Sequence, residues 1–404
     1  MFARILFQGD RSHLRQTLQH LGHRHAETLF PPDHDQVGFK LVGMSQLQAN
    51  SFLAWLAQQP FNGWWYESTD GPSGETCLLL GGSRNQLSML LSNPHRPASV
   101  DEPLSAIKQT LQYQQHAPTH LKLGDNLLEV NRRTYVMGIL NVTTDSFSDG
   151  GLYLKPELAV KHAEKMLEEG ADLIDVGGQS SRPGALPVSA AIEHQRVLPV
   201  VRDIVKQFGA GVSVDTYRSS VAQACLDAGA VLINDISAMR FDPQMAPLIA
   251  QYQASVVLMH MQGTPKTMQQ APCYQHVIDD VYGFFLQQMQ FALQHGISRQ
   301  QIILDPGFGF GKTVRHDFQL LQELAAFKSL GQPILVGTSR KSFLGHLLQR
   351  EVWDRLEGTL TSVIHAISQG ACLVRVHDVA PVVQAVRLAN ALSQPPDSLA
   401  CSIL

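Results

Sequence analysis

The sequence lacks long apolar runs, and none approaches the ~20 residues that a membrane-spanning helix needs. At the N-terminus it also lacks the basic region, apolar stretch and small-residue cleavage site of a signal peptide. The five cysteines among 404 residues are widely spaced, and no two form a C-x-x-C pair. This usage suits a reducing compartment better than a disulfide framework. We therefore expect a cytoplasmic protein that does not cross a membrane.

An excess of charge of one sign is also lacking. The formal net charge is −4, the isoelectric point is near 6.5, and no block of like charges appears. This excludes the basic footprint that nucleic-acid binding requires. There is no H-E-x-x-H motif and no Cys/His cluster, so a zinc site is not expected. What remains, 44% hydrophobic and 16% charged residues, is typical of an ordinary globular protein.

Composition changes near residue 120, and the chain is long enough for a large barrel with an extension. Residues 1–118 contain short strand-like runs that alternate with amphipathic helical stretches, which predicts a small α+β domain. We assign 1–118 to an N-terminal extension of unknown role and 119–404 to a second domain. The extension could be an interaction module, a dimerisation element or a structural cap.

From Tyr135 onward a strand–loop–helix pattern is repeated eight times. The strands are short and rich in Val, Ile and Leu, as expected for parallel strands that are covered on both faces. They end near Asn141, Asp175, Asp215, Asn234, His260, Asp305, Gly337 and His377. Eight such units predict an α/β fold, a (β/α)₈ TIM barrel preceded by the small α+β domain. The active site of such a barrel lies at the C-terminal ends of its strands, where these polar residues would meet.

Acidic and amide side chains end four of these strands: Asp175, Asp215, Asn234 and Asp305. Together they predict an acceptor-rich, partly buried floor. A flat heterocycle with several N–H donors, such as a 2-amino-4-oxo pterin ring, would suit it. The alternative is that these groups pair with Arg or Lys elsewhere in the barrel, because an unpaired buried carboxylate costs several kcal/mol.

Cationic groups follow the last two strands. Ser339, Arg340 and Lys341 come after the seventh strand, and Arg375 and His377 end the eighth. The loops after strands seven and eight of a barrel often bind phosphate, and these donors suit a pyrophosphate. A further cation, Arg182 in the second loop, could add to the site.

Two glycine-containing loops have alternative interpretations. Residues 307–313, GFGFGKT, resemble a P-loop, but that motif needs glycine where Pro306 stands. A tight loop that points Phe308 and Phe310 inward fits better. The first barrel loop, 141–151, is small and acidic, and could hold Mg²⁺ and close over an anion, because its oxygens are hard ligands. The alternative there is a solvated turn.

Seven segments in order resemble the motifs of the dihydropteroate synthase family. They read MGILNVTTDSFSDGG, GADLIDVGGQSSRPGA, SVDTYRSSVAQACLDAGAVLINDIS, LMHMQGTPKTMQ, LDPGFGFGKT, LVGTSRKSFLG and VRVHDV. The resemblance covers about 121–393. It implies a transferase of folate biosynthesis, in which p-aminobenzoate displaces pyrophosphate from (7,8-dihydropterin-6-yl)methyl diphosphate to give 7,8-dihydropteroate. It also implies small-molecule substrates, Mg²⁺ as cofactor, a homodimer and sensitivity to sulfonamides.

The resemblance also implies roles for individual residues. The catalytic residues would be Asp215, Lys341, Arg375 and His377. The pterin would be bound by Asp215, Asn234, Met259, Asp305 and Lys341. The diphosphate would be bound by Asn141, Arg375 and His377. The p-aminobenzoate pocket would be formed by Phe147, Ser180, Ser181, Pro183, Phe310 and Ser339. The ligands of Mg²⁺ would be Asn141 and Asp149.

The sequence departs from the family pattern at Thr144, Gln179 and Ser181, where the family usually has Pro, Glu and Thr. These departures leave affinity for p-aminobenzoate and sensitivity to sulfonamides open. Two rival interpretations also remain, a pterin-binding methyltransferase-type barrel and a catalytically impaired pterin-binding protein. The Ser339–Lys341 and Arg375–His377 anion groups argue against both.

Overall fold

A computed structural model describes residues 1–9, 36–61, 63–68, 76–143, 155–182 and 184–393. The chain divides into two units. The first comprises residues 1–117 with the later segments 274–283 and 325–331, and the second comprises 118–273, 284–324 and 332–404. From the sequence we predicted a single boundary at residue 118, with both later segments in the barrel.

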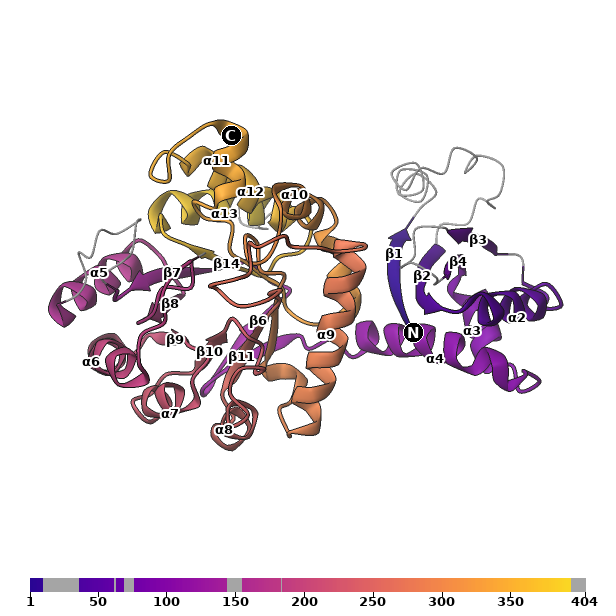
Figure 1. Cartoon of the computed structure of the whole chain (residues 1–404), viewed down its shortest axis with the longest axis horizontal. Coiled ribbons are helices and arrows are strands. Elements are labelled where there is room, and N and C mark those ends of the chain that lie inside the picture. The colour runs from indigo at the N-terminus through magenta and orange to yellow at the C-terminus, as the bar shows by residue number, and fades with distance from the viewer. Residues whose placement is uncertain (10–35, 62, 69–75, 144–154, 183, 394–404) are drawn as a thin grey trace, which may run out of the picture. The chain divides into compact units, whose positions relative to one another are not determined.

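The first unit contains a four-stranded antiparallel sheet with helices packed on it (Figure 1). In spatial order its strands are β1 (Phe2–Gly9), β2 (Gln36–Met44), β4 (Thr76–Ser83) and β3 (Trp64–Ser68). Its helices are α2 (Gln46–Leu56), α3 (Arg84–Ser92), η1 (Ala98–Val100) and α4 (Asp101–Gln115). Ser45 and Ser83 begin α2 and α3 with capping boxes, each completed by a glutamine three residues later. This is the predicted α+β architecture.

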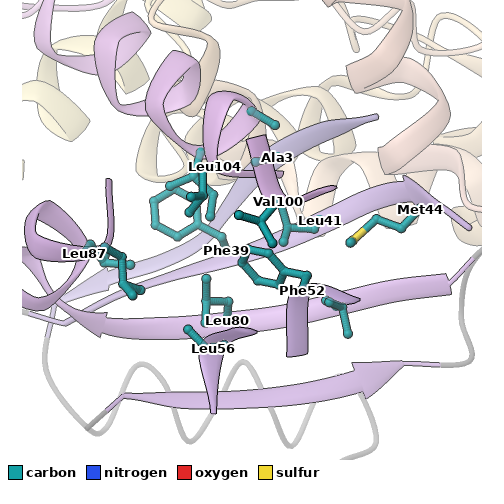
Figure 2. Packing of buried hydrophobic residues seen from close by; sticks show 14 of the residues in the cluster. Ala3, Phe39, Leu41, Met44, Phe52, Leu56, Leu80, Leu87, Val100 and Leu104 are labelled. Atoms are coloured by element: carbon teal, nitrogen blue, oxygen red, sulfur yellow. The ribbon is translucent and has the colours of Figure 1, made fainter. Parts of the chain in front are cut away.

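The core of the first unit lies between this sheet and its helices. Phe39 and Leu80 from the strands pack with Phe52, Val100 and Leu104, all nearly fully buried (Figure 2). The segment 274–283 contributes Asp279, a buried carboxylate that accepts from Arg4 Nε at 2.5 Å and from Lys40 Nζ at 2.7 Å. Burial alone would raise the pKa of Asp279, but the two cations hold it at about 2.

Tyr282, from the same segment, is also fully buried. Its ring stacks on Phe2 at a centroid distance of 5.3 Å, and its hydroxyl lies 2.9 Å from Ser329 Oγ. Through these contacts both later segments belong to the first unit.

The second unit is built on an eight-stranded parallel sheet, in the order β12-β11-β10-β9-β8-β7-β14-β13. Its strands are β7 (Tyr135–Asn141), β8 (Leu173–Gly177), β9 (Gly211–Asp215), β10 (Leu232–Asp235), β11 (Ser255–Met259), β12 (Ile302–Asp305), β13 (Leu335–Val336) and β14 (Leu373–Val376). A parallel bridge between Leu304 and Ile334 joins the two end strands. The sheet thus closes into the predicted TIM barrel.

Helices surround this ring of strands (Figure 1). They are α5 (Pro156–Glu168), α6 (Ala190–Phe208), α7 (Ser219–Asp227), α8 (Met245–Tyr252), α9 (Val277–Gln294), η2 (Arg299–Gln301), α10 (Val314–Gln322), α11 (Ser342–Leu348), α12 (Leu356–Ser368) and α13 (Val379–Ser393). The first turns of α9 and nearly all of η3 (Leu324–Leu330) belong to the first unit. Among the described residues, no helix combines the length and apolar character needed to cross a membrane.

One end of the barrel interior is apolar. A hairpin forms from β5 (His120–Leu123) and β6 (Asn126–Glu129), and its Leu121 and Leu123 pack with the inward side chains Leu173 and Leu232. Side chains two residues apart on a strand point to the same face. Asp175 and Asn234, two positions after these leucines, therefore point inward as well. The strand geometry thus predicts a polar layer above the apolar one.

Candidate active site

A cavity of about 480 Å³ opens at the C-terminal ends of the barrel strands. Most of the predicted site residues line it: Asn141, Ser180, Ser181, Asp215, Asn234, Met259, Asp305, Phe310, Ser339, Lys341, Arg375 and His377. Phe147, Asp149 and Pro183 lie outside the described residues, as does Thr144. The eight strand ends therefore bring together residues that are up to 236 positions apart, from Asn141 to His377.

Arg375 links two carboxylates at the base of the cavity. Its Nε donates to Asp175 Oδ2 at 2.6 Å, and its Nη2 donates to Asp215 Oδ2 at 2.9 Å. The same Asp175 oxygen accepts from Asn234 Nδ2 at 3.1 Å. Asp175 is fully buried and does not line the cavity, so it lies beneath the floor. The acidic strand ends were predicted either to pair with a barrel arginine or lysine or to form a ligand-binding floor. Asp175 pairs with Arg375 and is not exposed to the cavity, whereas Asp215 pairs with Arg375 and also faces the cavity.

The pKa values of Asp215, Asp305 and Lys341 are all shifted from their ordinary values. Burial raises the pKa of Asp215 to about 7, an effect that Arg375 opposes and Asp175 increases. Burial also raises the pKa of Asp305, which accepts from the Gly307 N–H at 2.8 Å. Burial and the charge of Arg375 lower the pKa of Lys341 to about 8, while Asp305 opposes the shift. Asp215 and Lys341 can therefore change charge near neutral pH, which is common at catalytic sites.

The cationic side of the cavity is formed after β13 and β14. The His377 N–H donates to Ser339 Oγ at 3.2 Å, and this oxygen lies 3.2 Å from His377 Nδ1. Burial, with the charges of Arg340 and Arg375, lowers the pKa of His377 well below its usual value, so the imidazole is neutral at pH 7. Arg340 is paired with Asp378 through Nε at 2.9 Å and Nη2 at 2.5 Å.

Arg340 has a left-handed backbone conformation, with φ of +57°. A non-glycine residue rarely adopts this conformation, and strain of this kind is concentrated at functional sites. It sits between Ser339 and Lys341, both of which line the cavity. The left-handed turn at Arg340 therefore allows the residues on either side of it, Ser339 and Lys341, to present side chains to the same site.

The GFGFGKT loop does not bind phosphate through its lysine. Lys312 is buried, and its Nζ lies near four acceptors, at 3.0 Å from His260 Nδ1, 3.2 Å from His260 O, 3.0 Å from Gly307 O and 3.1 Å from Phe310 O. A Cβ on Gly307 would lie 2.1 Å from the His260 carbonyl oxygen, so only glycine fits there. The lysine therefore holds the loop, and Phe308 and Phe310 line the cavity as predicted.

Two ring contacts lie close to the glycine loop, one inside the cavity and one beneath its lining. Lys341 Nζ lies 4.3 Å above the ring centroid of Phe310. His260 is a buried core histidine, because its ring packs edge-on to Phe284 at 4.8 Å and does not line the cavity. Burial and the charge of Lys312 lower its pKa well below the usual value.

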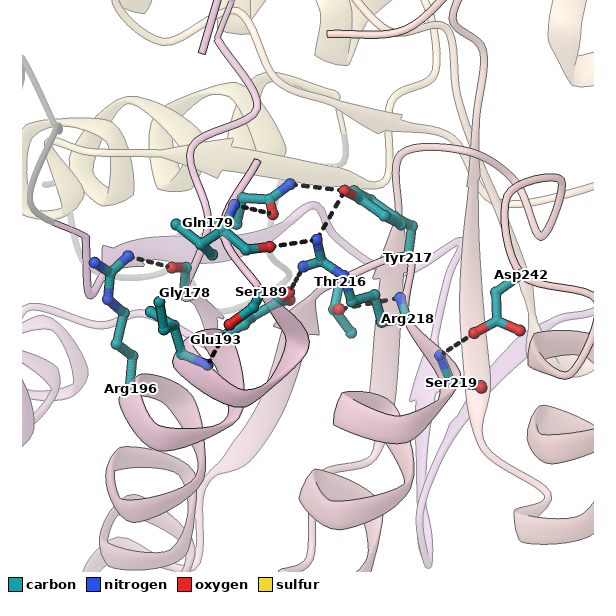
Figure 3. A network of polar contacts seen from close by, with 12 residues as sticks. Gly178, Gln179, Ser189, Glu193, Arg196, Thr216, Tyr217, Arg218, Ser219 and Asp242 are labelled. Carbon is teal, nitrogen blue, oxygen red and sulfur yellow. Dashed lines mark hydrogen bonds and ion pairs between the residues drawn. The ribbon is translucent and has the colours of Figure 1, made fainter. Parts of the chain in front are cut away.

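The second barrel loop is tied to the loop that follows β9 (Figure 3). Gln179 Nε2 donates to the Tyr217 hydroxyl at 3.0 Å, and the Val188 N–H donates to Gln179 Oε1 at 3.1 Å. Arg218 donates to the Tyr217 hydroxyl at 3.2 Å and to the Val188 carbonyl at 2.7 Å, and it pairs with Glu193. Tyr217 and Arg218 were not predicted as site residues, although they lie only two and three positions after Asp215.

Trp353 also lines the cavity and was missed. It comes from the connection between α11 and α12 and not from a strand end, so the strand-end rule gives no signal for it.

Of the two predicted Mg²⁺ ligands, Asn141 and Asp149, only Asn141 lies among the described residues. Asn141 ends β7 and lines the cavity beside the cationic groups, and its amide oxygen is the hard donor that Mg²⁺ prefers. Within the part of the chain that the structure describes, no three His, Cys, Asp or Glu side chains are grouped as a metal site. This donor set fits a metal that is held mainly by substrate oxygens and water.

The chain is similar to known pterin-binding proteins. The pterin binding enzyme family model matches residues 137–377. The dihydropteroate synthase of Escherichia coli (strain K12) is 48% identical over 257 residues, which are 64% of this chain and 91% of that enzyme.

Solved structures of dihydropteroate synthases are also similar to this chain. A Yersinia pestis dihydropteroate synthase with a sulfonamide drug complex aligns at 43% identity and a TM-score of 0.66, covering 68% of this chain and 99% of that one. A Xanthomonas albilineans dihydropteroate synthase with 4-aminobenzoic acid aligns at 41% identity and a TM-score of 0.64, covering 69% and 99%. Roughly a third of this chain has no counterpart in these structures.

Proposed function

The chain belongs to the dihydropteroate synthase family of pterin-binding enzymes, and from this we propose which of its residues perform each part of the reaction. The reaction joins p-aminobenzoate to (7,8-dihydropterin-6-yl)methyl diphosphate and releases pyrophosphate. The observation that carries the assignment of residues is the Arg375 bridge, because it places the main diphosphate cation beside the carboxylate assigned to the pterin.

The pterin would bind on the acidic floor. Asp215, Asn234 and Asp305 offer oxygen acceptors for the N–H groups of the ring, and all three line the cavity. Lys341 would donate to a ring acceptor, and Met259 would pack on the ring face. The Met259 side chain belongs to an apolar cluster with Ile236, Met261 and Met268, which provides a surface for a flat ring.

The diphosphate would bind at the cationic side, held by Arg375, His377 and Asn141. Arg375 can keep its Nε bond to Asp175 while Nη2 exchanges its bond to Asp215 for one to the diphosphate, because the two bonds leave from different nitrogens. Asp175 is therefore the permanent counter-ion of this arginine, whereas Asp215 is released for the pterin.

The reaction is a substitution at the pterin methylene carbon. The amine nitrogen forms a C–N bond there while the C–O bond to the diphosphate breaks and its electron pair leaves with pyrophosphate. The nitrogen then loses a proton to solvent. Arg375 and His377 would stabilise the charge of the leaving group, and the Asp215 carboxylate would stabilise positive charge that develops on the pterin. An aromatic amine is neutral at pH 7, so it needs no general base to become a nucleophile.

We propose Mg²⁺ as the cofactor, held by Asn141 together with diphosphate oxygens, water and Asp149, which lies outside the described residues. Mg²⁺ commonly keeps several waters and uses one or two protein ligands with substrate phosphates. When bound, it would neutralise part of the diphosphate charge. Removal of Mg²⁺ with EDTA should stop pyrophosphate release, and N141A should require a higher Mg²⁺ concentration for half-maximal rate.

The amine would bind between the second loop and the glycine loop. Ser180 and Ser181, with Ser339 and Phe310, line this part of the cavity. Phe147 and Pro183 would complete the pocket and lie outside the described residues. The Xanthomonas albilineans relative was solved with 4-aminobenzoic acid and the Yersinia pestis relative with a sulfonamide, which supports both compounds as ligands of this chain.

We also propose a homodimer formed through the last barrel helices. The neighbouring helices α12 and α13 expose large apolar side chains, with Ile364 at 37%, Leu388 at 63% and Leu392 at 76% exposure. Burial of such side chains in a second copy would be favourable. Light scattering should give twice the chain mass for the wild type and the chain mass for L388E.

The described cysteines Cys77, Cys225, Cys273 and Cys372 are free thiols, which supports a cytoplasmic location.

A pyrophosphate-release assay tests the proposal. The purified protein is given the dihydropterin diphosphate and Mg²⁺, with and without p-aminobenzoate. Release that depends on p-aminobenzoate, with dihydropteroate formed, is the expected result. Release without that dependence would contradict the amine pocket, and bound pterin without release would favour a catalytically impaired binding protein.

A further inference from the structure

Tyr217 joins two parts of the active site. It lies two residues after Asp215, and its half-buried ring packs on the Ile236, Met259, Met261 and Met268 cluster that is assigned to the pterin face. The ring also meets Phe241 edge-on at 5.5 Å. At its other end the hydroxyl accepts from Gln179 Nε2 at 3.0 Å (Figure 3). One side chain therefore connects the pterin wall with the second loop.

Arg218 holds the same loop at its other end. Its Nη2 donates to the Val188 carbonyl at 2.7 Å and to the Tyr217 hydroxyl at 3.2 Å. The buried Glu193 pairs with its Nη1, and its guanidinium carbon lies 4.9 Å from the Tyr217 ring centroid. Gln179 closes the loop on itself by accepting from the Val188 N–H at 3.1 Å. The segment from Gln179 to Val188, which carries Ser180 and Ser181, is thus anchored at its start and its end.

We propose that Tyr217 and Arg218 are positioning residues that hold the second loop, through Gln179 and Val188, in the arrangement that binds the aromatic amine. They would therefore set the affinity for p-aminobenzoate and for sulfonamides without touching either. The proposal rests on the assignment of Ser180 and Ser181 to the amine pocket. It also gives Gln179 a function that a glutamate could share, because a carboxylate can accept from both the Val188 N–H and the Tyr217 hydroxyl.

The effect should be confined to one substrate. The pterin groups Asp215, Asn234 and Asp305 end barrel strands, and their positions are maintained by the parallel ladders. Among its described residues the second loop has no ladder beyond Gly177. Apart from the Gly184 N–H, which donates to the Pro265 carbonyl at 3.1 Å, it is held to its neighbours by side-chain bonds. Loss of those bonds should weaken amine binding and leave pterin binding intact.

The first test is Y217F, which removes the hydroxyl and keeps the ring packing. Its KM for p-aminobenzoate and its sulfonamide inhibition constant should both rise about threefold to tenfold, the effect of one or two hydrogen bonds. The KM for the dihydropterin diphosphate and the melting temperature should stay at wild-type values. Y252F is the matched control. The Tyr252 hydroxyl, on α8, donates to Asp227, on α7, at 2.6 Å, and neither residue lines the cavity.

Rescue and coupling provide a second readout. Q179L should raise the KM for p-aminobenzoate, and Q179E should restore it to within about twofold of wild type. The double variant Y217F/Q179L should show less than the sum of the two single effects, because both changes remove the bond between Gln179 and Tyr217. Equal rises in both substrate KM values, additive effects, or no change in Y217F would overturn the proposal.

S181A separates this proposal from the assignment of the pocket. If S181A leaves the KM for p-aminobenzoate unchanged, the second loop does not bind the amine. The pocket assignment is then wrong, and so is the positioning role that rests on it. If S181A raises that KM while Y217F does not, the pocket assignment stands and the positioning role alone is wrong.

Discussion

Arg375 Nη2 donates to Asp215 Oδ2 at 2.9 Å, so the cation assigned to the diphosphate is paired with the carboxylate assigned to the pterin. A substrate that carries both groups would satisfy the two partners at once. Its diphosphate would take the arginine nitrogen, and its ring N–H groups would take the carboxylate oxygen. The ion pair therefore links the two halves of the site before substrate arrives.

Arg375→Ala should separate the two halves of substrate recognition. It removes a charged donor from the diphosphate, so affinity for the dihydropterin diphosphate should fall about tenfold to a hundredfold. Affinity for a pterin without phosphate should fall much less. Calorimetric titration of the variant with both ligands measures the difference. Equal losses for the two ligands would contradict the assignment of Arg375 to the anion.

Asp215→Asn should separate binding from turnover. The amide keeps an oxygen acceptor for the pterin but cannot stabilise positive charge that develops on the ring. We expect kcat to fall by about two orders of magnitude or more, while the affinity for the pterin changes by less than about tenfold. Single-turnover pyrophosphate release and pterin titration measure the two quantities. A variant with near-wild-type turnover would remove Asp215 from the mechanism.

Much of this site could be predicted because it lies at strand ends. Asp215 and Asp305 end short, mostly apolar parallel strands, Asn234 stands one position before the end of another, and barrel geometry then brings the three together. No side-chain detail was needed for that inference.

The direction of a loop side chain could not be predicted in this way. Lys312 could face a phosphate or its own loop carbonyls, and only the folded backbone shows that it faces the carbonyls. The assignment of residues 274–283 to the first unit was equally hidden, because it depends on Asp279 meeting Arg4 and Lys40, which are 275 and 239 positions away. Local pattern carries no information on such pairs.

The pH dependence of kcat/KM for the dihydropterin diphosphate should be bell-shaped. Asp215 must be ionised to accept from the pterin, and its pKa is about 7, so the rate should rise as pH increases through 7. Lys341 must be protonated to donate, and its pKa is about 8, so the rate should fall as pH increases through 8. In Lys341→Arg the cation persists at high pH, and the alkaline fall should move upward or vanish. If the fall at alkaline pH were unchanged in that variant, a group other than Lys341 would be responsible for it.

The stability of the first unit should depend on Asp279. This buried carboxylate is the shared partner of Arg4 and Lys40, and Asp279→Asn would leave both cations beside a neutral amide. Breaking a buried ion pair in this way costs about 3 to 5 kcal/mol, so urea should unfold the variant at a clearly lower concentration at pH 7. Asp354→Asn is the control, because its pair with Arg350 is exposed and should contribute less than about 1 kcal/mol.

The same carboxylate gives a second measurement with a defined sign. Its folded pKa of about 2 lies below the ordinary value of 3.8, so its stabilising effect is complete above that value and is lost as pH falls from about 4 to 2. The wild type should therefore approach the variant in stability over this range. If the difference between wild type and Asp279→Asn stayed constant from pH 7 to pH 2, the charge of Asp279 would not be what stabilises the first unit.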